Sequence, residues 1–118
     1  MNEIKNTLSD FLINTKAASA LILDGKGKLI TSLDLEYGDS VAAMTAAILS
    51  MSEKLLDDLD KGILKQLFLK TTDGVIIGNK ISKSNFLIIF SNDGSNLGLF
   101  MRTTEELANE LSKKPLLQ

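Results

Sequence analysis

Apolar positions recur with a helical period in three segments of the chain, and five short apolar runs lie between these segments. In the first segment, Ile4, Leu8 and Phe11 are separated by four and three residues, which predicts an amphipathic helix over residues 3–15. Glu3 lies near its start, where a negative charge complements the helix dipole.

The last helical segment has two candidate starting points. Asn96 suits an N-cap, and the apolar residues after it keep the helical period, so we prefer a start there. A T-x-x-E capping box over residues 103–106 leaves a later start open. Pro115 should end the helix, and we expect residues 115–118 to be a frayed tail.

The five short runs are typical of β-strands separated by turns. Gly25 and Gly27 lie in the first predicted turn, and Thr72-Asp73-Gly74 marks a second. Gly78 interrupts one run, where it suggests a β-bulge. The run at 86–91 is almost wholly apolar and should be a central strand. The five predicted strands are 18–24, 28–33, 63–71, 75–81 and 86–91.

The middle helix, predicted over residues 39–60, is apolar on two sides. Asp39 or Ser40 suits its N-cap, and Gly62 suits the position after its end. We expect a first stripe to face the sheet: Val41, Met44, Ile48, Met51, Leu55 and Leu59. A second, alanine-rich stripe comprises Ala42, Thr45 or Ala46, Leu49 and Leu56. Since small residues permit close helix–helix approach, this stripe predicts self-association.

The order of elements predicts the fold class. It reads helix, strand, strand, helix, strand, strand, strand, helix over 118 residues, which suits a single α/β (α+β) sandwich domain spanning residues 1–118. The simplest packing is one five-stranded, mostly antiparallel sheet with helices on both faces.

Composition narrows the chemistry. The chain has no histidine and no cysteine, so it lacks the usual general base, a Ser-His-Asp triad and thiolate ligands. We therefore expect no enzyme activity, no metal and no cofactor. A net charge of -2 and few aromatic residues argue against a nucleic-acid partner. No run reaches the length of a membrane span or a signal peptide, so we expect a cytoplasmic protein without membrane insertion.

Three local features have both a functional and a structural interpretation. The Gly25–Lys28 run lacks the phosphate-loop pattern and reads as a hairpin turn. Asp57, Asp58 and Asp60 could suggest a metal site, but their spacing scatters them around a helix end, where a solvated surface is expected. Arg102 is the single arginine of the chain. It could act as an arginine finger for a GTPase, but we favour a surface residue on the last helix.

Taken together, these segments resemble the roadblock family of dynein light chains and their prokaryotic relatives. The resemblance runs over residues 3–112 and rests on ALILDGKGKLITS, AAMTAAILSMSEKLLDDLDKG, ILKQLFLKTTDGVIIGNKI and FLIIFSNDGSNLGLFMRTTEEL. It implies a sheet with the long helix on one face and the terminal helices on the other. It also implies dimers, formed by the middle helix and the strand after it, with a copy of the chain or a second roadblock-type chain.

The resemblance further implies a function. Family members typically contact Ras-like small GTPases, so our leading hypothesis is a homodimeric, non-catalytic module that binds and regulates such a GTPase, in the manner of a GTPase-activating protein. The alternative is a nucleotide-insensitive scaffold or adaptor in a motor, trafficking or membrane-signalling complex. A small-ligand sensor is a minor alternative, since no polar pocket is recognisable.

Two sets of site residues follow. The predicted dimer interface comprises Ala42, Thr45, Ala46, Leu49, Leu56, Leu64, Gln66 and Phe68. The predicted GTPase contacts are Ser50, Glu53, Lys54 and Asp57.

Overall fold

The helices and strands follow one another along the chain in the predicted order, and a short 3-10 helix follows the last of them. The computed structural model describes residues 1–118. Bounds differ from the predicted ones by a few residues at most, and the last helix begins directly after Asn96, as preferred. The elements are α1 (Asn2–Thr15), β1 (Ser19–Asp24), β2 (Leu29–Leu33), α2 (Gly38–Asp58), β3 (Gln66–Lys70), β4 (Val75–Lys80), β5 (Asn85–Ser91), α3 (Leu97–Leu111) and η1 (Pro115–Leu117).

The five strands form one antiparallel sheet in the order β2-β1-β5-β4-β3. The apolar strand β5 lies at the centre, as predicted. The bulge predicted at Gly78 is wrong, because Gly78 pairs in register with both Leu67 and Ile88. The register shift lies between Ile22 and Leu23, beside the glycine-containing turn.

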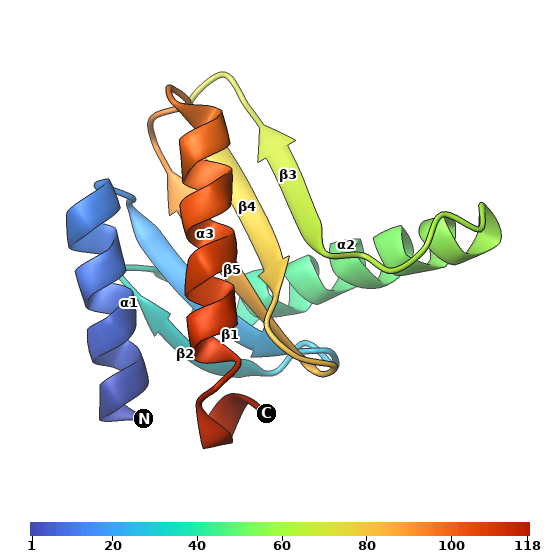
Figure 1. Cartoon of the computed structure of the whole chain (residues 1–118), viewed down its shortest axis with the longest axis horizontal. Helices are drawn as coiled ribbons and strands as arrows, with labels where there is room; N and C mark the ends of the chain where they lie inside the picture. Colours follow the sequence, from blue (N-terminus) through green and yellow to red (C-terminus); the bar gives the residue numbers. More distant parts are fainter.

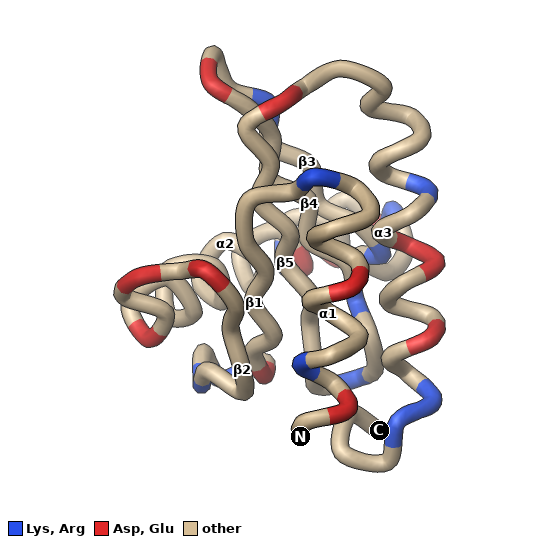
Figure 2. Tube along the Cα trace, turned by 90° about the vertical axis from the view of Figure 1, so that its left-hand side faces the viewer, with Lys and Arg blue, Asp and Glu red and all other residues tan.

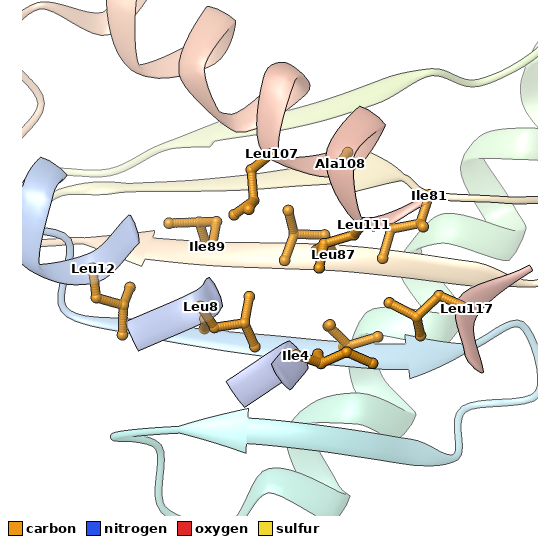
Figure 3. Packing of buried hydrophobic residues seen from close by; sticks show 12 residues of the cluster. Ile4, Leu8, Leu12, Ile81, Leu87, Ile89, Leu107, Ala108, Leu111 and Leu117 are labelled. Atoms are coloured by element: carbon orange, nitrogen blue, oxygen red, sulfur yellow. The ribbon is translucent and has the colours of Figure 1, made fainter. Parts of the chain in front are cut away.

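The sheet separates two layers of helices (Figure 1). Successive side chains of β1 and β5 point to opposite faces, so both strands can be apolar throughout and fill two cores. One core joins α1 and α3 to the sheet through Ile4, Leu8, Ile22, Ile89 and Leu111, among others (Figure 3). The other core joins α2 to the sheet through Leu21, Leu23, Ala42, Leu49, Phe86 and Ile88, among others.

The C-terminal segment is packed against this scaffold, so the predicted frayed tail is wrong. Pro115–Leu117 form a 3-10 turn, and Leu117 is fully buried in the α1/α3 core. The side chain of Asn85 donates a hydrogen bond to the carbonyl oxygen of Leu117 (3.1 Å). Lys114 forms an ion pair with Glu3 near the start of the chain. An apolar side chain and a buried amide therefore hold a segment that the sequence presents only as a short tail after a proline.

Both ends of α2 differ from the predicted ones. Tyr37, in a left-handed conformation, precedes the helix, and no side chain caps it. At the other end, Lys61 N–H donates to Leu56 O and Asp60 N–H donates to Asp57 O. This is a Schellman motif with Asp60 (φ 57°) in the position predicted for Gly62. The C-terminal half of α2 extends beyond β3, past the edge of the sheet (Figure 1).

Candidate interaction surface

One stripe of α2 faces the chain's own sheet. Ala42 is fully buried and Leu49 is 2% exposed, while Ala46 and Leu56 pack partly against the same core. Small side chains bring the helix close to the β1–β2 turn, where a Cβ at Gly27 would lie 3.3 Å from the Cβ of Ala46. Gly27 also adopts a φ of 88°, so glycine is required there on two grounds.

The predicted assignment of the two stripes is therefore reversed, except for Val41, which packs against the core under α2 as predicted. Ala42 and Leu49 belong to the intramolecular core and are not available to a second chain. The physical reason lies in the sheet. Leu49 approaches it over Gly78, where a side chain would be tightly placed, since a Cβ would lie 3.0 Å from Ile88 Cδ1 and 4.0 Å from Leu49 Cδ2. The absence of a side chain at Gly78 thus leaves room for Leu49, and the absence of one at Gly27 leaves room for the alanines of α2.

The stripe of longer apolar residues faces outward. Met44 is 61% exposed, Met51 74% and Leu55 58%, and Ile48 and Leu59 are exposed as well. These five residues, at i, i+4, i+7, i+11 and i+15, form one helical face that we call the free apolar stripe. Full burial of one such side chain contributes about 1.5–3 kcal/mol, so covering this stripe would be strongly favourable.

A groove connects the free apolar stripe with the sheet. Its volume is about 200 Å³, and eight of its ten lining residues are hydrophobic. Met44 and Ile48 form the helix side of this groove, and Leu67, Leu69 and Phe90 form the sheet side. The apolar surface of α2 therefore continues onto β3, the outermost strand on this side.

Strand β3 has a free backbone edge. Lys65 O accepts a hydrogen bond from Lys80 N–H, and Thr71 N–H donates to Gly74 O, so the odd-numbered residues between them bond to β4. The backbone groups of Gln66, Phe68 and Lys70 consequently point away from the sheet. Such an edge can accept another strand.

The other residues of the predicted dimer interface are distributed over both faces. Leu64 is buried in the α2 core, and Thr45 lines the apolar groove. The side chain of Gln66 turns to the opposite face, where its Nε2 donates to Asn79 Oδ1 (2.8 Å) and to Met101 O (3.1 Å). Phe68 shares that face with Gln66, because alternate residues of a strand point the same way. Gln66 and Phe68 therefore contribute only their backbone groups, at the free edge of β3, to the predicted dimer interface.

The predicted GTPase contacts are only partly brought together. Ser50, Lys54 and Asp57 lie at i, i+4 and i+7 on a third, solvent-facing stripe of α2, and all three are exposed. Glu53 falls on the sheet-facing stripe instead, where its carboxylate lies 4.0 Å from Lys80 Nζ. Lys54 is paired with Asp58 on the helix surface.

The carboxyl groups with lowered pKa values belong to residues outside α2. A hydrogen bond from Lys28 N–H lowers the pKa of Asp24, one from Ser95 N–H lowers the pKa of Asp93, and the hydrogen bond with Lys114 lowers that of Glu3. Asp24 Oδ1 accepts from Lys26 N–H and Lys28 N–H, both at 2.9 Å, so this side chain stabilises the β1–β2 turn.

The α2 surface has no recognisable cluster of catalytic or metal-binding side chains. No cluster of three or more acidic, histidine or cysteine side chains could hold a metal ion. Arg102 is exposed on α3, across the sheet from α2. No helix is both long and apolar enough to cross a membrane. What the α2 surface does provide is apolar contact area and free backbone hydrogen-bonding groups, which are means of binding.

Comparison with known proteins agrees with this architecture. A family model described as "Roadblock/LC7 domain" matches residues 3–91. Among solved structures, MglB of Myxococcus xanthus superposes with a TM-score of 0.87 at 18% identity, covering 94% of this chain and 93% of that one. The gliding protein MglB of Thermus thermophilus gives 0.84 at 15%, covering 95% and 87%. MglC of Myxococcus xanthus gives 0.61 at 12%, covering 92% and 96%. No curated protein sequence matches the chain.

Proposed function

The chain belongs to the Roadblock/LC7 family, and on that basis we propose that it is a homodimeric, non-catalytic interaction module that binds and regulates a Ras-like small GTPase in the cytoplasm. The single observation that carries the proposal is the free apolar stripe of α2, which is continuous with the open edge of β3. A surface of this kind is typical of a protein–protein interface.

A second copy of the chain is the occupant that best suits this surface. Antiparallel pairing of two β3 edges about a two-fold axis would join two sheets into one and bring the two α2 helices together. The free apolar stripes and grooves would then cover each other. A solved structure described as MglB with a tetrameric arrangement, similar at 16% identity with a TM-score of 0.85, is an oligomer with this fold.

The GTPase would contact a different part of α2. Pairing through the free apolar stripe leaves the solvent-facing stripe with Ser50, Lys54 and Asp57 exposed on both copies. A composite of two such stripes would bind the switch loops of the GTPase, as the family resemblance implies. The module would regulate by favouring one conformation of the GTPase, so the hydrolytic chemistry would remain the GTPase's own.

Direct binding to a Ras-like GTPase from the same genome tests the proposal. We expect the purified chain to retain the GTPase, with affinity that depends on whether GDP or a GTP analogue is bound. Lys54→Glu should weaken retention, and Lys16→Glu, an exposed lysine at the end of α1, is the matched control. Absence of binding in both nucleotide states would refute the GTPase as partner.

A single-turnover hydrolysis assay separates regulation from scaffolding. A regulator should change the rate of GTP hydrolysis when it is added in excess over the GTPase. Binding that is equal in both nucleotide states, with an unchanged hydrolysis rate, would instead favour the scaffold or adaptor function.

A further inference from the structure

A second surface lies on the other face of the sheet, in the groove between α1 and α3. The two helices run antiparallel, with the start of α1 beside the end of α3 (Figure 1). The open groove between them has a volume of about 620 Å³ and includes Phe11 and Leu107 in its lining. It continues into a hollow of about 380 Å³ below the β5–α3 loop, since both share Asn14, Thr15 and Thr103.

The groove is rimmed by carboxylates that have no cationic partner. Asp10 lines it from α1, and Glu106 and Glu110 line it from α3. None of these three takes part in an ion pair. The only cation in the lining, Lys114, is already paired with Glu3. Figure 2 shows acidic segments on both helices, with basic residues following at the end of α3.

This arrangement of charges is unfavourable for the isolated chain. Glu106 and Glu110 are spaced i, i+4 on the same helix, where like charges repel each other. Glu110 also lies in the last turn of α3, at the negative end of the helix dipole. Lys113 and Lys114 follow the helix end, and Lys114 is paired with Glu3. Asp10 adds a third negative charge on the other side of the groove.

We propose that this groove binds a basic amphipathic helix of a partner protein. Lysine or arginine side chains of that helix would meet the carboxylates of Asp10, Glu106 and Glu110, while its apolar side chains would contact the half-buried Phe11. Leu99, which is 57% exposed in the adjoining hollow, extends the apolar contact. A helix of about 15 residues would match α1 and α3 in length.

The proposal is independent of the α2 surface. The groove between α1 and α3 lies on the opposite face of the sheet from α2. A dimer formed through α2 and β3 would therefore carry two copies of the α1/α3 groove, one on each subunit. The carboxylates of the groove would repel phosphate-bearing partners and attract a cationic protein segment.

The test uses a synthetic amphipathic peptide of about 15 residues, with leucine on one face and lysine on the other. Titrated into the isotopically labelled full chain, it should cause saturable amide chemical-shift changes in α1 and α3, around Asn14, Thr103 and Glu106. The double variant Glu106→Gln/Glu110→Gln should weaken binding about fivefold. The same variant should raise the thermal midpoint of the free chain, because it removes an internal repulsion.

The matched control is Glu36→Gln/Glu105→Gln, which removes the same amount of charge from two exposed positions outside the groove. It should leave the affinity for the peptide unchanged. Equal weakening by both double variants would overturn the proposal, because it would indicate diffuse attraction to an acidic protein. Shifts that map to α2, or no saturable shift at millimolar peptide, would also overturn it.

Discussion

At the scale of single residues, the side chain of Thr31 stands out in the core. It is 5% exposed, and its Oγ1 is the buried side-chain polar atom without a hydrogen-bond partner. Thr31 pairs with Ile22 across β1 and β2, so it lies on the face that α1 and α3 cover. A buried hydroxyl without a partner costs about 1–3 kcal/mol relative to a satisfied one.

Thr31→Val should therefore stabilise the chain. The substitution keeps the shape and β-branching and removes the unsatisfied hydroxyl, so we expect the free energy of unfolding to rise by about 1 kcal/mol. Thr31→Ser is the control, since it keeps the hydroxyl and loses the methyl group, and it should lower stability by about 1 kcal/mol. Urea denaturation measures both. A valine variant less stable than wild type would show that the hydroxyl is needed.

Asp24 gives a pH-dependent prediction at the same scale. Its pKa is lowered from 3.8 in the folded state by the hydrogen bond from Lys28 N–H. A lowered folded-state pKa stabilises the fold above the unfolded value and loses that effect as the pH falls through the folded value.

Asp24→Asn should consequently lower the thermal midpoint at neutral pH, and the gap to wild type should close below about pH 4. The measurement is a series of thermal melts between pH 7 and pH 3. A gap that stays constant over this range would mean that the charge of Asp24 contributes nothing to the turn.

At the scale of elements, α2 shows what the sequence could and could not predict. Helical periodicity predicts the helix and both of its apolar stripes, and turn residues predict every strand. Hydrophobicity cannot decide which stripe meets the sheet, because both stripes are apolar. The choice depends on the hollow over Gly78, which forms only when β3, β4 and β5 are assembled. A better criterion for orienting α2 is side-chain size: the stripe that contains alanines packs against the sheet, and the stripe of longer apolar residues faces outward.

Strand β3 gives the prediction at this scale. The N–H of Phe68 points to the open edge, so proline at this position leaves the pairing with β4 intact but removes a donor that a second β3 would need. Phe68→Pro should therefore weaken dimerisation by at least about tenfold. Phe68→Ala loses the same aromatic side chain and keeps the N–H, so it should remain dimeric. Sedimentation of both variants measures the effect. Equal dissociation of the two would place the effect in the side chain.

At the scale of the whole molecule, the two ends of the chain close one core and leave the other face free for assembly. Leu117, Ile4 and Ile81 belong to the same buried cluster, so the last residues complete the layer under α1 and α3. This closure depends on a contact between residues far apart in sequence, which is why a short tail after Pro115 gave no sign of it. The α2 face, by contrast, keeps its apolar stripe exposed.

Leu117→Ala should lower the free energy of unfolding by about 2–4 kcal/mol, because it leaves a cavity in this closed core. Leu116→Ala is the matched control one residue away, where the side chain is 64% exposed, and it should change stability by less than about 0.5 kcal/mol. Chemical denaturation of the two variants measures the difference. Similar, small effects at both positions would mean that the tail is not packed in solution.

The mass of the chain in solution tests the central claim, that the free apolar stripe of α2 binds a second copy. Light scattering after size exclusion should give twice the chain mass of 12.8 kDa for wild type. Met51→Glu, at a position that is 74% exposed in the single chain, should give a folded species of 12.8 kDa. Ser50→Glu, on the solvent-facing stripe, should remain at twice that mass. A wild-type chain of 12.8 kDa, or a Met51→Glu variant that stays dimeric, would contradict the account.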